Sequence, residues 1–295
     1  MLEQHHLMQT GSWYVDDSGS PHAANEVDQS MNDFLLRYLG QLQLTVSEQG
    51  IQIIWHVETV SEDAVRRLID CLFHLPSITP VHLKCYFHGW ASERSSSPRS
   101  AARRLDDLLS LRGLDIAGSA FKTSRCVSDI PRAAKSISDG YELWHRTSGD
   151  FRKADASVLA SLLPRVLIFS PSREDGTLVF SHIGTRSTAA RVHGFRWASS
   201  ALNKKSDETL PDNERYDKHV SSTYQAVHLS KKPAYDHVRA LIHFDSDRDS
   251  IWVPFQRLVS PCTLHNGREA VMSLVIPTQD ICVPFGRSPT TPPAA

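Results

Sequence analysis

The order of predicted elements in the C-terminal half constrains the fold of this chain most. Between Pro164 and Pro277 the sequence predicts two strands, two helical stretches and then three strands in succession. The first two strands are apolar runs at 165–170 and 177–183, and the turn between them ends in Asp-Gly. An Asn-Gly pair between the last two runs is a strong hairpin signal. Few small folds have this order, which is typical of a sensor-type module rather than of an enzyme.

Short motifs at the boundaries of these elements resemble those of one known family. They occur in the family's order and cover about half of the chain, from near Gly140 to Asp280. The motifs are Trp144 with Gly149, Arg152-Lys-Ala-Asp155, Leu162-Leu-Pro164, Gly184-Thr185, Lys231-Lys-Pro233 and Arg257-Leu-Val-Ser-Pro261. Together they resemble the bacterial PAS domains of the PAS_5 type, which are common in alphaproteobacteria.

The resemblance implies an α+β module: a PAS-like five-stranded antiparallel sheet with helices on one face. A ligand pocket would then lie between the sheet and its helical cover, and its occupant would be an unknown small molecule. The candidate pocket residues are Val166, Phe180, His193, Trp197, Tyr224, Trp252 and Phe255. Strand alternation puts Trp252 and Phe255 on opposite faces, so these residues cannot all line one cavity. A closed core that serves a protein partner is the alternative.

The helix expected before the module carries apolar side chains on one face. Ile137, Tyr141 and Trp144 recur at spacings of four and three, which places them side by side on a helix. The sequence therefore predicts a homodimer contact through these three residues. The same side chains could instead cover the module's own sheet.

The N-terminal half predicts a second, smaller α/β layer. Strands are expected at 50–57 and 81–87, with a helix after each, and Ser61 is placed to cap the first helix. This order indicates a right-handed crossover between parallel strands. The predicted organisation is a disordered arm at 1–28, an α/β domain of unknown family at 29–130, the PAS-like domain at 131–280 and a disordered tail at 281–295.

The sequence offers little support for catalysis or cofactor binding. It contains neither a Gly-x-Gly-x-x-Gly loop nor a Gly-x-Ser-x-Gly elbow, and its 15 histidines form no His-Glu-x-x-His motif. We therefore expect no enzyme, no metal site, and neither haem nor flavin. The rival hypothesis is an enzyme in the N-terminal layer that uses His56, His82 or His88 with Glu58.

Composition limits the partners and the compartment. A formal net charge of −1 argues against binding to nucleic acid or anionic membranes through charge. Five widely spaced cysteines without a Cys-x-x-Cys pair indicate a reducing cytoplasmic setting. We expect a cytoplasmic sensor or adaptor that lacks a catalytic output domain and acts through a small molecule or a protein partner.

Overall fold

The computed structural model describes residues 10–24, 29–76, 78–113, 120–209, 214–242, 250–281 and 283. The chain is α+β in class, and its strands pair in both parallel and antiparallel fashion. It divides into two compact units. Unit 1 comprises Met1–Ile116, Leu241–Trp252 and Pro284–Ala295, and unit 2 comprises Ala117–Ala240 and Val253–Val283. The first division along the chain therefore falls before the boundary expected at residue 130, and the segment Leu241–Trp252 is grouped with unit 1.

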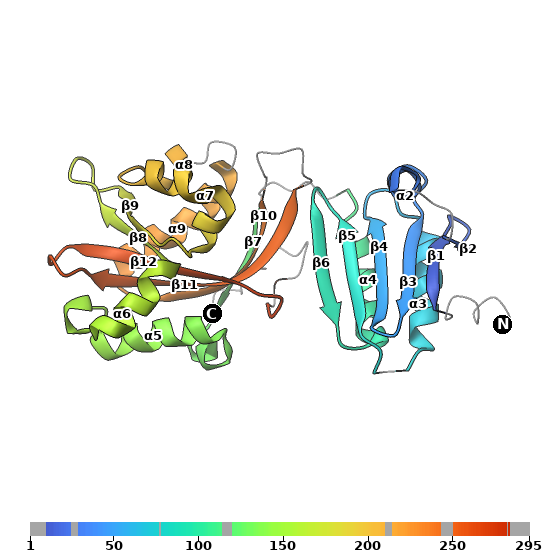
Figure 1. Ribbon diagram of the computed structural model, residues 1–295, viewed down its shortest axis with the longest axis horizontal. Coiled ribbons are helices and arrows are strands. Elements are labelled where there is room, and N and C mark those ends of the chain that lie inside the picture. The colour runs from blue at the N-terminus through green and yellow to red at the C-terminus, as the bar shows by residue number, and fades with distance from the viewer. Residues whose placement is uncertain are drawn as a thin grey trace, which may run out of the picture. The chain divides into compact units, whose positions relative to one another are not determined.

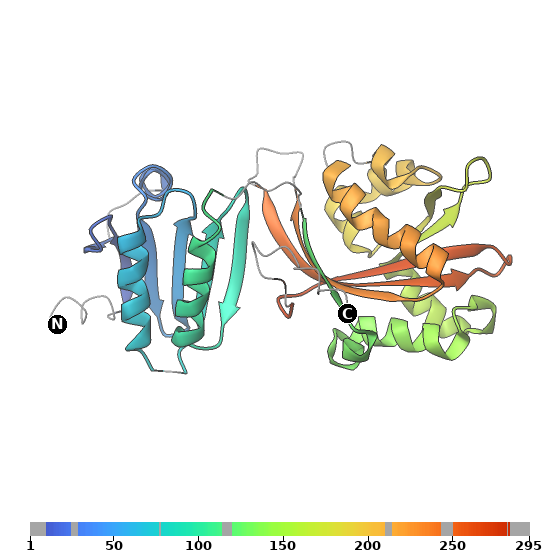
Figure 2. The same ribbon diagram turned by 180° about the vertical axis from the view of Figure 1, so that it is seen from behind.

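Unit 1 is a sheet whose helices α3 and α4 lie side by side on one face (Figure 2). Its strands are β1 (Gly11–Val15), β2 (Pro21–Ala23), β3 (Leu42–Ser47), β4 (Gly50–His56), β5 (Val81–Tyr86) and β6 (Trp90–Ser95). Its helices are α2 (Gln29–Arg37), α3 (Glu62–Phe73) and α4 (Pro98–Leu109). The strand order is β2-β1-β3-β4-β5-β6.

The predicted parallel strand pair of unit 1, with a helix between its strands, is confirmed. β4 and β5 are parallel neighbours, and α3 connects them. Ser61 caps α3, since its side chain accepts a hydrogen bond from the backbone N–H of Ala64. The apolar side chains at helical spacing face the sheet, and Val65, Leu68 and Leu72 are buried.

The predicted disordered segments differ from the structure. Within residues 1–28, the stretch from Gly11 to Ala23 forms the antiparallel pair β1 and β2, with Tyr14 and Val15 buried. At the other end, Val283 is also buried, and its carbonyl accepts a hydrogen bond from Arg239 Nε at 3.2 Å. Residues 1–9, 25–28, 282 and 284–295 lie outside the described residues.

Unit 2 contains the five strands expected from the sequence and one more. They are β7 (Ala120–Arg125), β8 (Val166–Pro171), β9 (Leu178–Ile183), β10 (Ala234–Ile242), β11 (Ile251–Thr263) and β12 (Glu269–Pro277). The order is β7-β10-β11-β12-β8-β9, so β8 and β12 are antiparallel neighbours and β9 is an edge strand. The additional strand β7 lies within residues 29–130, the range expected for the N-terminal domain, and it pairs antiparallel with β10.

Helices cover both faces of the unit 2 sheet, which corrects the expectation of one covered face (Figure 1). One face carries α5 (Lys135–Thr147) and α6 (Ala156–Leu162), together with the short turns η1 (Val127–Arg132), η2 (Phe151–Lys153) and η3 (Leu163–Arg165). The other carries α7 (Thr188–Ala201), α8 (Ser206–Thr209) and α9 (Glu214–Ser230). Alternate residues of β8 serve the two faces: Val166 and Ile168 face α5 and α6, whereas Leu167 and Phe169 face α7 and α9.

Candidate functional site

A continuous series of aromatic rings fills the space between the sheet and its α7–α9 cover. His193 and Trp197 of α7 lie 4.9 Å apart between ring centroids, and Trp197 meets Phe180 of β9 edge-on at 6.0 Å. Phe180 contacts Phe169 of β8 at 4.6 Å, and Phe169 stacks on Tyr224 of α9 at 4.4 Å. These separations are those of rings in direct contact, so the series is a packed core rather than an open chamber. We call these five residues the aromatic stack.

A glycine bend gives α7 the shape it needs to reach the stack. Ser187 caps the first turn by accepting from the backbone N–H of Ala190, and Gly194 interrupts the helix at φ 86° and ψ 171°. Only glycine adopts that conformation readily. Beyond the bend, Trp197 Nε1 donates a hydrogen bond to the carbonyl oxygen of Thr209 at 3.3 Å.

A buried ion pair lies at the other end of the stack. The side chains of Arg257 (β11) and Asp236 (β10) have exposures of 0% and 1% and form a contact of 2.5 Å between Nη2 and Oδ2. Arg257 Nη2 also donates to Thr223 Oγ1 at 2.9 Å, and its guanidinium lies 5.5 Å from the ring centroid of Tyr224. A charge this deeply buried is tolerated only with such partners.

The unpredicted strand β7 completes this polar cluster. Ser124 Oγ donates to Asp236 Oδ1 at 3.1 Å, and Lys122 Nζ donates to Thr223 Oγ1 at 3.1 Å. Burial lowers the pKa of Lys122; Asp236 opposes this shift and Arg257 adds to it. We call Lys122, Thr223, Ser124, Asp236 and Arg257 the polar cluster. Sequence reasoning missed it, because its members become neighbours only through the β7–β10–β11 pairing.

The structure brings together four of the seven candidate pocket residues: Phe180, His193, Trp197 and Tyr224. Val166 faces α5 and α6 instead, and its neighbour Leu167 faces the α7–α9 cover. Phe169, the centre of the stack, was not among the candidates, although it lies two residues after Leu167 in a predicted strand and so on the same face of the sheet.

The other two candidates are Trp252 and Phe255. Trp252 belongs to unit 1, where its Nε1 donates to the carbonyl of Phe87 at 2.7 Å. Phe255 is buried, and strand alternation puts it on the sheet face of Arg257.

Two pockets of unit 2 lie away from the stack. One, of about 500 Å³, is mainly apolar and is lined by residues that include Phe151, Leu159, Leu163 and Leu264. The other, of about 640 Å³, lies where β12 ends and α7 begins. None of the seven candidate pocket residues lines either of them.

The candidate dimer residues pack against the sheet of their own unit. Ile137 is completely buried in the α5 core. Tyr141 and Trp144 are partly buried with centroids 5.8 Å apart, and Trp144 Nε1 donates to the carbonyl of Pro261 at 2.8 Å. Only Tyr141 and Trp144 therefore present surface, and the homodimer stays a prediction that rests on these two residues.

The rival active site in unit 1 stays a hypothesis, and its residues have the following contacts. His56 stacks on Tyr86 at 4.7 Å, whereas His82 lies opposite Gln52 and accepts a hydrogen bond from Arg94. Glu58 instead accepts from the backbone N–H of Gly113 at 3.3 Å. His88 contacts the ring of Phe87.

Across the described part of the chain, no group of three or more His, Cys, Asp or Glu side chains is arranged to hold a metal ion. None of the helices that the structure describes is long and apolar enough to cross a membrane.

Comparisons with solved structures give distant likenesses, one of which is described below. No family model matches the sequence, and no curated protein matches it either. A solved structure of an RNA-binding light-oxygen-voltage receptor is similar at 14% identity with a TM-score of 0.29. The likeness covers 63% of this chain and 45% of the receptor chain, so the chain spans less than half of that protein. A TM-score this low does not establish a shared fold.

Proposed function

We propose that this protein is a signal-transduction sensor or adaptor whose unit 2 acts as a PAS-like module, without catalytic output of its own. One observation carries the proposal. The first and last strands of the module, β8 and β12, are antiparallel neighbours within the sheet, and the α7–α9 cover is inserted between the second and third strands. This is the arrangement expected if the ordered motifs of the sequence reflect a PAS-like fold.

The motif residues also contact one another, which supports the resemblance. A Cβ atom on Gly184 would lie 2.5 Å from the backbone of Leu163 and Pro164, so the Gly-Thr motif needs glycine where it packs on the Leu-Leu-Pro motif. Likewise, a Cβ atom on Gly149 would lie 2.7 Å from the carbonyl oxygen of Pro261, to which Trp144 donates its hydrogen bond. Motifs far apart in sequence thus pair in space.

The packing of the stack favours a protein partner over an internal ligand. Phe169 lies against both Phe180 and Tyr224, so a small molecule would have to displace a ring to enter. Any signal would then pass through a shift in the position of the α7–α9 cover, which is a change in population between two states.

Thermal melting of the full chain with apolar and aromatic compounds separates the two modes. A compound that binds only the native state raises the melting temperature by mass action. An internal ligand predicts a rise that is lost in Phe180→Trp and kept in Phe195→Trp, because Phe195 is 75% exposed on the same cover. A protein partner predicts no rise with any compound. Catalytic turnover that is lost in His56→Ala or Glu58→Gln would overturn the proposal.

A further inference from the structure

The larger of the two pockets described above is lined by positively charged side chains. Its volume is about 640 Å³, and three arginines line it, namely Arg165, Arg186 and Arg191. Two threonines and the last three residues of β12 complete the wall: Thr185, Thr188, Val275, Ile276 and Pro277. None of these eight residues is acidic. The pocket is therefore wide enough for a small molecule and carries charge of one sign.

Hydrogen bonds fix the walls of this pocket. Arg165 Nη1 donates to Ser136 Oγ of α5 at 2.8 Å, which holds one guanidinium in place. The backbone N–H of Arg186 donates to the carbonyl of Pro164 at 2.6 Å. Thr188 Oγ1 donates to the carbonyl of Val275 at 3.0 Å, which ties the start of α7 to the end of β12. The pocket is thus assembled from three elements that the fold holds together.

The three arginines lack the counter-charge that other arginines of this unit have. Arg152 pairs with Asp150 at 2.8 Å and Arg257 with Asp236 at 2.5 Å. Within the described ranges, no carboxylate forms an ion pair with Arg165, Arg186 or Arg191. Like charges that share a pocket repel one another, and an anion placed among them relieves that repulsion. Guanidinium groups match the oxygens of phosphate and carboxylate groups in bidentate fashion.

We propose that this pocket binds a small anion that carries phosphate or carboxylate groups. The guanidinium groups of Arg165, Arg186 and Arg191 bind the anion's oxygens, and the exposed hydroxyl of Thr185 adds a donor. The ligand joins the β9–α7 turn to the end of the central strand β12. This site is separate from the aromatic stack and does not depend on the sensor or adaptor proposal.

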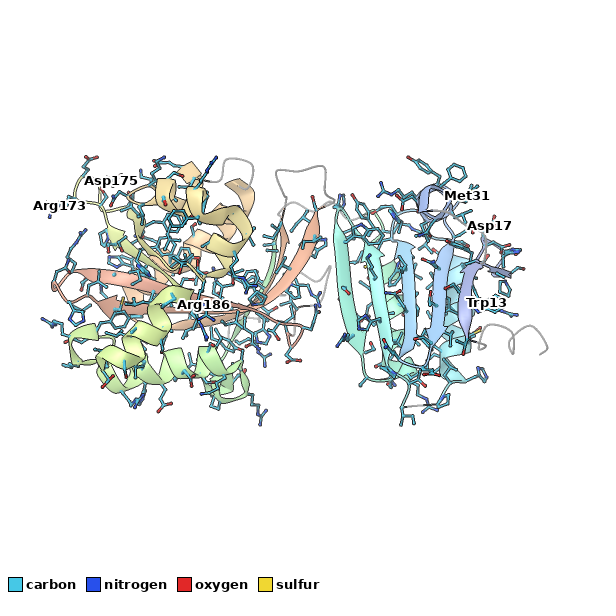
Figure 3. The ribbon with its side chains drawn as sticks, in the orientation of Figure 1. Trp13, Asp17, Met31, Arg173, Asp175 and Arg186 are labelled. Carbon is cyan, nitrogen blue, oxygen red and sulfur yellow. The ribbon has the colours of Figure 1, made fainter. Side chains whose placement is uncertain are left out.

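Isothermal titration calorimetry of the full chain tests the site with three probes at constant ionic strength in chloride: inorganic phosphate, pyrophosphate and citrate. The test variant is Arg186→Gln with Arg191→Gln, because both side chains are exposed and make no hydrogen bond that supports the fold. The matched controls are Arg196→Gln, exposed on α7 outside the pocket, and Arg173→Gln at the β8–β9 turn. Figure 3 labels Arg173 and Arg186.

We expect pyrophosphate, citrate or both to bind the wild type and both controls. The double variant should bind about tenfold or more weakly, with an unchanged melting temperature in the absence of probe. Preference for pyrophosphate identifies a phosphate ligand, and preference for citrate a carboxylate ligand. Probe-induced shifts in the amide resonances of Thr185 and Thr188 would place the anion in the pocket.

Three results would overturn the proposal. The first is no binding of any probe at about 1 mM. The second is wild-type affinity in the double variant. The third is an equal loss of affinity in Arg173→Gln or Arg196→Gln, which would indicate attraction by surface charge in general. None of these results bears on whether the aromatic stack admits a ligand.

Discussion

The buried pair of Arg257 and Asp236 should contribute strongly to the stability of unit 2, because neither side chain reaches solvent. Asp236→Asn keeps the shape of the side chain and removes its charge. The charge of Arg257 then remains buried without a counter-charge. Lys122 also loses the negative charge of Asp236, which favours its protonated form. Breaking a buried pair from one side costs about 3–5 kcal/mol, and we expect a loss in this range.

A double-mutant cycle separates the pair from its surroundings. Arg257→Met in the Asp236→Asn background removes the stranded charge and leaves an apolar side chain against Tyr224. We expect the double variant to be more stable than the sum of the single losses predicts, by about 2–3 kcal/mol. The control is Glu269→Gln, which breaks the exposed pair with Lys231 in the same unit and should cost less than about 1 kcal/mol.

Urea denaturation of the full chain, followed by circular dichroism, gives these free energies of unfolding. Hydrogen exchange of β10 and β11 peptides assigns the loss to unit 2. The reasoning fails if Asp236→Asn is no more damaging than Glu269→Gln, or if the two losses simply add.

Three further predictions follow from particular residues. Gly194→Ala should destabilise the protein by about 1–3 kcal/mol, since its φ and ψ are nearly exclusive to glycine, whereas the exposed Arg196→Ala should be neutral; equal unfolding midpoints would contradict this. Burial lowers the pKa of His237, and the charge of Arg125 lowers it further. The neutral His237 therefore contributes to stability above the ordinary pKa of 6.5, and this contribution is lost as the pH falls through the lowered pKa. His237→Gln should therefore flatten the decline in stability between about pH 7 and pH 5, and an unchanged slope would contradict that assignment. A fragment of residues 117–283 should unfold cooperatively. A fragment that starts at Gly140 lacks β7 and the buried Ile137, so it should not unfold cooperatively. Calorimetry of both fragments tests this, and a cooperative transition in the shorter one would contradict it.

Turn chemistry and apolar runs were sufficient to predict the strands β8 to β12 of unit 2 but not β7, and the cap at Ser61 marked the crossover helix of unit 1. It was harder to predict which face of the sheet each strand residue points to. The run from Val166 to Ser170 is buried throughout, because helices cover both sides of β8, so alternation could not tell Val166 from Leu167.

The polar cluster was beyond sequence reasoning for a different reason. β7 reads Ala-Phe-Lys-Thr-Ser-Arg, which carries no apolar alternation, and only its pairing with β10 gives Lys122 and Ser124 a role. Likewise, Trp252 was a candidate pocket residue because it is an aromatic residue of the PAS-like half, but β11 passes from unit 1 into unit 2 and Trp252 belongs to unit 1. Register and connectivity, rather than residue type, decided these cases.

The most direct test of the account is the pairing of β8 with β12, on which the PAS-like assignment depends. Nuclear Overhauser effects between backbone protons of the two strands report it in solution. We predict cross-strand contacts in antiparallel register that join Leu167 to Ser273 and Phe169 to Val271. Contacts that join β8 to β10 or β11 instead, or a parallel register with β12, would contradict the account.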